Sequence, residues 1–88
     1  MTAQATPPHA EQRVMLNGEE RTTHAASLLE LIAHYTDTPL SEDGRPADGS
    51  ALGIAVAVDG AVASRGRWAS TPVRDGAVVE VLTAKKGG

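Results

Sequence analysis

The chain has 88 residues, no cysteine and a formal net charge of −3, with eight Lys and Arg against eleven Asp and Glu. This length accommodates one small domain, and the lack of cysteine excludes a disulfide framework and a thiolate nucleophile or metal site. The acidic balance, with one Trp, one Tyr and no Phe, argues against a nucleic-acid-binding protein.

The first twelve residues are polar, contain two prolines and show no periodicity, which predicts a disordered N-terminal leader over 1–12. They contain no apolar core of a signal peptide, and His9 is expected to be solvated. The longest apolar run, residues 54–58, is far too short to cross a bilayer. We therefore expect a cytoplasmic protein with no membrane partner, in keeping with the absence of cysteine.

Residues 13–16 predict a short strand in which Val14 and Leu16 face one side and Met15 the other. The following Asn-Gly pair indicates a two-residue type I′ hairpin turn, because both positions of that turn need positive φ. Residues 19–23 then return as a second strand, whose polarity is typical of a sheet edge.

A helix is predicted over residues 27–36. Ser27 and Glu30 have the spacing of a capping box, in which the Ser oxygen accepts a backbone N–H and the Glu side chain reaches back. The apolar residues that fall on one helical face are Leu28, Leu31, Ile32 and Tyr35. His24 and His34 are expected at the surface, since no further ligand completes a metal spacing.

Residues 37–53 are rich in Pro, Gly, Asp and Ser and predict a long loop. Such a loop is unusual in a compact domain and is either mobile or functional, although loop entropy also allows a tolerated insertion.

Residues 54–58 alternate large and small apolar side chains and predict a strand whose larger residues face the helix. Asp59-Gly60 indicates a second hairpin turn. Residues 61–63 begin the returning strand, and 65–68 are expected to continue it irregularly.

Asp75-Gly76 predicts a turn into a last strand over 78–82, followed by a flexible tail over 83–88 that ends Gly-Gly. The order of hairpin, helix, hairpin and single strand predicts an α+β domain over 13–82. In it, one main helix packs on one face of a mixed sheet of about five strands. The first and last strands are expected to pair in parallel at its centre, which is the β-grasp (ubiquitin-like) plan.

The sheet face without a helix should carry Met15, Ala57 and Leu82. Apolar residues on an uncovered face beside a tail suggest a partner-docking surface, to which Lys85 and Lys86 could contribute if they are not simply solvated. A terminal glycine presents a carboxylate without a neighbouring side chain, and such a group can be activated as an acyl-adenylate.

Several stretches resemble the ThiS-type sulfur carriers (ThiS/MoaD-like proteins of the ubiquitin-like β-grasp family) over about residues 13–88, apart from the 37–53 loop. The most specific part is the C-terminal third, in which a Trp stands ahead of an Asp-Gly turn, a strand and Gly-Gly. The matching residues are Asn17-Gly18-Glu19, Leu28-Leu29-Glu30-Leu31, Ala55-Val56-Ala57-Val58-Asp59-Gly60, Arg65, Trp68-Ala69, Val73, Asp75-Gly76, Val79-Glu80-Val81, Thr83-Ala84 and Gly87-Gly88.

The resemblance implies a carrier, not an enzyme, with no catalytic residue, bound cofactor or metal of its own. It implies that an E1-like adenylating enzyme (ThiF type) uses ATP to adenylate the carboxylate of Gly88. A sulfur donor protein then displaces AMP, and the thiocarboxylate supplies a thiazole synthase (ThiG type) or an equivalent acceptor in thiamine biosynthesis. Gly87 would give the tail access to narrow active sites, because a Cβ there would widen the chain.

Other functions remain open from the sequence. The chain could be the small subunit of molybdopterin synthase, although it lacks the aromatic-rich first strand associated with that group. It could carry sulfur for cysteine or a natural product, act as a ubiquitin-like modifier, or be a plain β-grasp interaction module. A hydrolytic enzyme is disfavoured, because no motif places a catalytic triad or a carboxylate pair.

Overall fold

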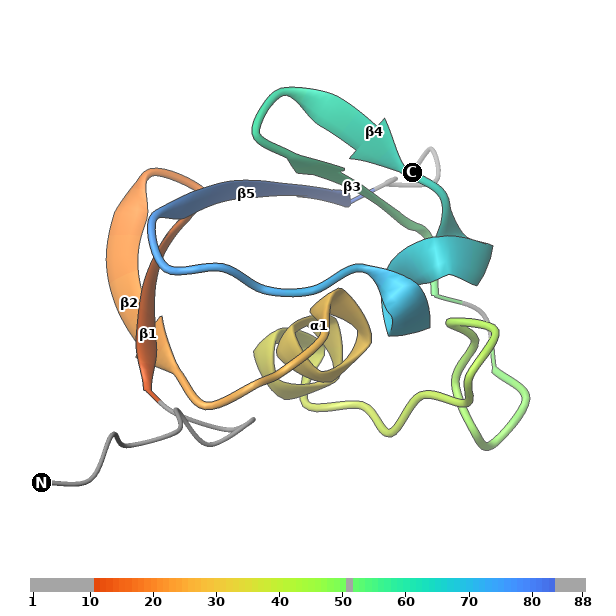
Figure 1. The fold of residues 1–88 in the computed structure, drawn as a ribbon. Coiled ribbons are helices and arrows are strands. Elements are labelled where there is room, and N and C mark those ends of the chain that lie inside the picture. The colour runs from red at the N-terminus through yellow and green to blue at the C-terminus, as the bar shows by residue number, and fades with distance from the viewer. Residues whose placement is uncertain (1–10, 51, 84–88) are drawn as a thin grey trace, which may run out of the picture.

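The computed structural model describes residues 11–50 and 52–83. These residues form a five-stranded mixed sheet with the order β2-β1-β5-β3-β4 and one α-helix packed on one face (Figure 1). The elements are β1 Gln12–Leu16, β2 Glu19–Thr23, α1 Leu28–Thr36, β3 Ile54–Val58, β4 Ala61–Ala63, the 3₁₀ helix η1 Arg65–Ser70 and β5 Ala77–Thr83. The predicted α+β class and β-grasp plan are confirmed.

The last strand lies in the middle of the sheet. β5 pairs in parallel with β1, where Val14 lies opposite Ala77 and Leu16 opposite Val79. On its other side β5 pairs antiparallel with β3, from Val58 opposite Val79 to Ile54 opposite Thr83. The predicted parallel pairing of the first and last strands is therefore confirmed.

Both two-residue hairpin turns form as the Asn-Gly and Asp-Gly pairs predict. Asn17 and Gly18 have φ of 52° and 84°, and Asp59 and Gly60 have φ of 52° and 86°. Positive φ at both positions is the requirement of a type I′ turn, and its twist matches that of the flanking strands.

The helix begins at the predicted Ser27 cap. Ser27 Oγ accepts a hydrogen bond from the Glu30 N–H at 3.2 Å. Glu30 Oε1 in turn accepts one from the N–H of Ala26 at 2.9 Å, one residue earlier than a capping box would place it. The helix ends at Asp37, which adopts the left-handed conformation with φ of 54°.

The core lies between α1 and the inner face of the sheet. Its largest fully buried side chains are Trp68, Leu28, Ile32, Val14, Val56 and Val79. Tyr35, expected on the buried helical face, is 38% exposed. It lies at the edge of the helix, where its hydroxyl accepts a hydrogen bond from Asn17 Nδ2 and its ring lies under the guanidinium of Arg21.

The bounds of β1 and β5 differ from the sequence predictions. β1 begins at Gln12, inside the expected leader, where Gln12 pairs with Thr23 of β2 and its side-chain amide donates to the carbonyl of Val73 at 2.7 Å; residues 1–10 lie outside the described part. β5 is longer than predicted at both ends, from Ala77 to Thr83, so Thr83 belongs to the strand and not to the expected tail.

The expectation that residues 65–68 continue β4 is wrong. They form η1, in which the Arg67 N–H donates to the Ser64 carbonyl at 2.8 Å. This turn directs the Trp68 ring into the core, and its indole N–H donates to the carbonyl of Ala63 at 3.0 Å. In η1 the Trp68 ring is buried and its indole N–H is hydrogen bonded. This favours the 3₁₀ helix over an extended continuation of β4.

Candidate functional site

The tail residues Lys85, Lys86, Gly87 and Gly88 lie outside the described residues, so their roles stay predictions. Thr83, the last described residue, is opposite Ile54 in the β3–β5 ladder. Because β3 and β5 are antiparallel, the chain leaves the sheet at the end where β3 begins. The residues that follow Thr83 are therefore attached at this end of the sheet.

Met15, Ala57 and Leu82 lie on the sheet face opposite α1, where the sequence placed them. Met15 is 37% exposed and Leu82 69% exposed. The strand register puts further apolar residues beside them, because Val78 is opposite Met15 and Val62 is opposite Ala57. We call this the open face, and its apolar members are Met15, Ala55, Ala57, Val62, Val78 and Leu82.

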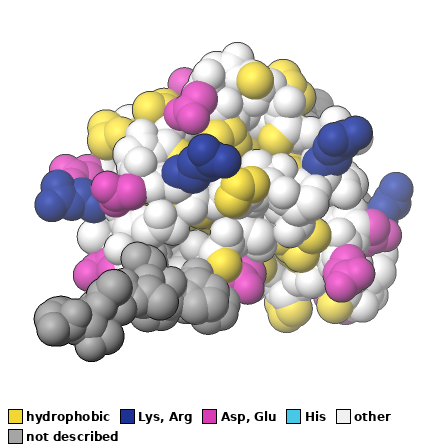
Figure 2. All heavy atoms as spheres, viewed as in Figure 1, with side chains coloured by type: hydrophobic (Ala, Val, Ile, Leu, Met, Phe, Trp, Pro, Cys, Tyr) yellow, Lys and Arg dark blue, Asp and Glu magenta, His cyan; other side chains and the backbone are white. Residues whose placement is uncertain are grey.

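The docking surface predicted from the sequence did not include Val62 and Val78, although Val62 is 83% exposed. The alternation of each strand, combined with the pairing partners, would have placed them there. Figure 2 shows hydrophobic and acidic side chains along the upper edge of the molecule, which is where the sheet lies in Figure 1.

A carboxylate lies within the open face. Glu80 is opposite Ala57 and lines a shallow hollow of about 60 Å³ together with Ala55, Val62 and Leu82. At the β1–β2 side, Arg13 and Glu20 form an exposed ion pair at 3.4 Å. The face thus offers an apolar centre with a negative charge in it, and so suits a partner with apolar side chains and a cation.

Arg65 connects the long loop to the sheet. Its guanidinium donates to the carbonyls of Gly44 at 2.8 Å, Leu52 at 2.6 Å and Ile54 at 3.2 Å. It also stacks over the Trp68 ring, 4.8 Å from the ring centroid. One side chain therefore holds the middle and the end of the loop against η1, at the start of β3.

The loop also has hydrogen-bonded turns of its own. The Ser41 N–H donates to the Arg45 carbonyl at 2.8 Å, and Leu40 and Pro46 form an isolated β-bridge. Asp43 and Asp48 accept hydrogen bonds from residues two positions later, Arg45 and Ser50. Hydrogen bonds from Ser41 and Ser50 lower the pKa of Asp43 and of Asp48, respectively. The described part of the loop is thus a folded insertion beside α1 (Figure 1).

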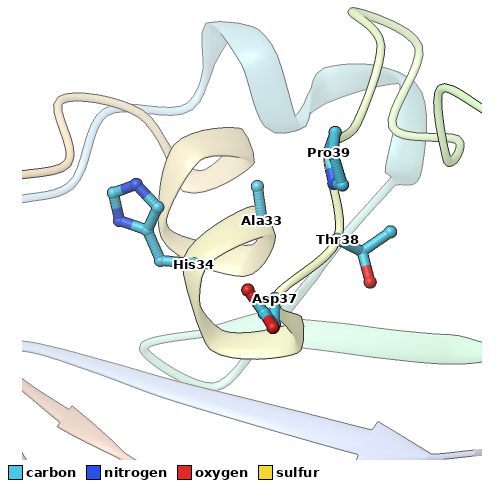
Figure 3. Close-up of a pocket in the computed structure, with 5 residues that line it drawn as sticks. All are labelled: Ala33, His34, Asp37, Thr38 and Pro39. Carbon is cyan, nitrogen blue, oxygen red and sulfur yellow. The ribbon is translucent and has the colours of Figure 1, made fainter.

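The hollow at the C-terminal end of α1 does not assemble a reactive site. It is lined by Ala33, His34, Asp37, Thr38 and Pro39, and the His34 ring points away from Thr38 and Pro39 (Figure 3). His24 and His34 are both exposed, as expected. Within residues 11–50 and 52–83, no three His, Asp or Glu side chains come together as a metal site.

Comparison with known protein families gives a match to the ThiS family model over residues 14–88. The chain belongs to the ThiS family. A solved structure, a thiamine biosynthesis protein (ThiS) from Geobacter metallireducens, is 25% identical with a TM-score of 0.56, covering 88% of this chain and all of that one. A search of curated proteins found no match.

The ThiS match agrees with the resemblance in the sequence and spans nearly the whole described sheet. None of the described helices is long and apolar enough to cross a membrane. The family match also runs through residue 88, so it includes Gly87 and Gly88.

Proposed function

We propose that this chain is a sulfur carrier of thiamine biosynthesis and that its acyl group at Gly88 carries the sulfur. The observation that supports the proposal is the ThiS family match, which spans the sheet and the two glycines together. The solved ThiS structure supports it independently through the fold. In this role the chain is a co-substrate of other enzymes and has no catalytic residues of its own.

Replacing an oxygen of the Gly88 carboxylate by sulfur requires that the carboxylate first be activated, because an oxide is a poor leaving group. An oxygen of the Gly88 carboxylate attacks the α-phosphorus of ATP, pyrophosphate leaves, and an acyl-adenylate forms. Sulfide delivered by a sulfur donor then attacks the acyl carbon and AMP leaves, so that the C–O bond to AMP is replaced by a C–S bond. The thiocarboxylate is a sulfur nucleophile that stays attached to the protein until an acceptor takes it.

The carrier has to meet at least two partners, an adenylating enzyme of the ThiF type and a sulfur-accepting synthase of the ThiG type. The open face is the docking surface in this proposal, because two of its exposed apolar side chains, Val78 and Leu82, lie on β5, the strand that leads into the tail. Residues 84–88 span at most about 17 Å when fully extended, which is enough to cross an active-site channel while the sheet stays outside. Gly87 keeps that end narrow, and Lys85 and Lys86 would meet the channel walls.

Intact-protein mass spectrometry of the chain from its native cells tests the proposal. Replacement of one oxygen by sulfur at the C-terminus is the expected result. Attachment to lysines of other proteins would show a modifier, and an unmodified chain under sulfur demand would show a binding module; either outcome overturns the carrier proposal. Sulfur-dependent complementation of a thiazole-requiring strain separates the thiamine route from the molybdopterin route.

Deletion of Gly87 and Gly88 should abolish thiocarboxylate formation without affecting the fold. The free energy of unfolding in urea should change by less than about 0.5 kcal/mol, since surface changes away from packed groups have small effects. The control is Arg67→Ala, at an exposed position on η1 away from the tail and the open face, which keeps both glycines and should still become thiocarboxylated. Undiminished sulfur transfer in the truncated chain would discard the assignment of Gly88.

A further inference from the structure

The side chain of Asn17 binds the backbone of β5. Its Oδ1 accepts a hydrogen bond from the Val81 N–H at 2.7 Å, and its Nδ2 donates to the Val81 carbonyl at 3.3 Å. The backbone N–H of Asn17 donates to the Val79 carbonyl at 2.9 Å. A carboxamide has the donor and the acceptor of a peptide group, so Asn17 continues the β1–β5 ladder beyond Leu16, where β1 ends.

The amide of Asn17 is itself held in place. The type I′ turn fixes its backbone at φ of 52°. Its Nδ2 also donates to the hydroxyl of Tyr35 on α1 at 3.1 Å, and the Tyr35 ring lies 5.6 Å from the guanidinium carbon of Arg21 on β2. Both hairpin and helix therefore orient the carboxamide, as is needed for a group that positions another segment.

This contact lies at the point where β5 loses one of its two neighbours. Val81 is two residues before Thr83, and within the described sheet the pairing of Leu82 and Thr83 is with Ala55 and Ile54 of β3 alone. Asn17 is thus the last described partner of β5 on the β1 side. A strand held on both sides at Val81 leaves the sheet in a more restricted direction than one held only by β3.

We propose that Asn17 is a positioning residue for sulfur loading, which fixes the direction in which the chain leaves β5 toward Gly88. The inference rests on the proposed carrier function. An acyl group that must enter a partner's active site reacts faster when its approach is already restricted, because less conformational freedom is lost at the encounter.

The test compares Asn17→Ala with Asp59→Ala. Asp59 has the same φ, precedes Gly in the other type I′ turn, and accepts a hydrogen bond from the N–H of Val78 at the opposite end of β5. Both substitutions remove one turn side chain and place Ala in a left-handed conformation. They differ in which end of β5 they release.

The first readout requires no partner. Asn17→Ala should speed hydrogen exchange at the Val81 amide by about tenfold or more and lower the backbone order parameters of Leu82 and Thr83, whereas Asp59→Ala should act at Val78. Asn17→Asp retains the acceptor but replaces the donor by a second carboxylate oxygen that faces the Val81 carbonyl. It should therefore rescue little of the lost order. Unchanged order at Leu82 and Thr83 in Asn17→Ala would overturn the inference.

The second readout is pyrophosphate release with an adenylating enzyme of the ThiF type. We expect kcat/KM for the Asn17→Ala carrier to fall about fivefold or more and that for Asp59→Ala to stay within about twofold of the unaltered chain. An equal decrease of kcat/KM in the two variants would show that Asn17 has only a structural role and would overturn the inference. If the unaltered chain is not adenylated at all, the carrier proposal fails, and the order parameters alone decide whether Asn17 orients the end of β5.

Discussion

Asn17 and Asp59 hold equivalent places in two hairpins and use different chemistry to bind the same strand. Asn17 donates and accepts, and so satisfies both backbone groups of Val81. Asp59 accepts from the Val78 N–H through its carboxylate, while its own backbone N–H donates to the Val78 carbonyl at 2.7 Å. Asn and Asp both tolerate the positive φ that the first position of each turn requires. The choice of Asn at position 17 and Asp at position 59 therefore follows from the contact that each makes with β5.

The Trp68 ring is the largest fully buried side chain, and its indole N–H is hydrogen bonded to Ala63. Trp68→Phe should lower the free energy of unfolding by roughly 1–3 kcal/mol, because it leaves the Ala63 carbonyl without this donor. Trp68→Ala should cost about 3–5 kcal/mol and leave little folded protein. Urea denaturation followed by circular dichroism measures both changes.

The control for Trp68 is Val62→Ala, at a side chain that is 83% exposed, which should change the unfolding free energy by less than about 0.5 kcal/mol. A tolerated Trp68→Ala substitution would contradict the assignment of the ring as the packing centre of η1.

At the scale of elements, one long side chain, Arg65, links the loop between α1 and β3 to η1. Gly44 has φ of +82°, and a Cβ there would lie 2.4 Å from Cγ and 2.8 Å from the carbonyl oxygen of Arg65. The close approach brings the Gly44 carbonyl within hydrogen-bonding distance of the guanidinium. Gly44 is thus needed both for its backbone conformation and for its lack of a side chain.

Gly44→Ala should therefore be more destabilising than Gly49→Ala. Gly49 has φ of +83° with nothing within 4 Å of an added Cβ, so its substitution costs only the left-handed conformation, about 1–2 kcal/mol. Gly44→Ala carries the same backbone cost and also displaces Arg65 from Gly44. Equal unfolding free energies of the two variants in urea would show that the Arg65 contact does not hold the loop.

The elements differ in how far the sequence predicts them. Alternation and turn chemistry predict the four hairpin strands, and the spacing of Ser27 and Glu30 predicts the helix cap, because each depends on residues close in sequence. The central parallel pairing follows instead from the order of the elements. The shape of the loop and the formation of η1 depend on Arg65 and Trp68 contacting groups far along the chain. Six residues of η1 are also too few to show a helical period.

Part of the candidate site can likewise be predicted from local sequence patterns, and part cannot. The placement of Met15, Ala57 and Leu82 on the open face follows from strand alternation, and the strand register adds Val62 and Val78 to that face. The contact of Asn17 with Val81 joins residues 64 positions apart, and no local pattern indicates it.

At the scale of the whole molecule, one face of the sheet is covered by α1 and the other is open. A charge placed on the open face should leave the fold intact and weaken partner binding. We predict that Val62→Glu changes the unfolding free energy by less than about 0.5 kcal/mol and weakens binding to an adenylating partner by about tenfold or more.

The matched control for this surface is Ala69→Glu, an exposed position on η1, which contacts α1 on the other side of the sheet. It adds the same charge and should leave the affinity unchanged in titration calorimetry. Equal weakening by both variants would assign the effect to net charge and not to the open face.

The central position of β5 in the sheet also affects when the protein can fold during translation. Residues 77–83 follow every other described strand in the chain, yet they join the β1–β2 hairpin to the β3–β4 hairpin. Until these residues have emerged from the ribosome, no strand can join the two hairpins, so we expect a prematurely terminated product to leave the sheet open. The open face, to which β5 contributes Val78 and Leu82, therefore forms only in translation products that include residues 77–83.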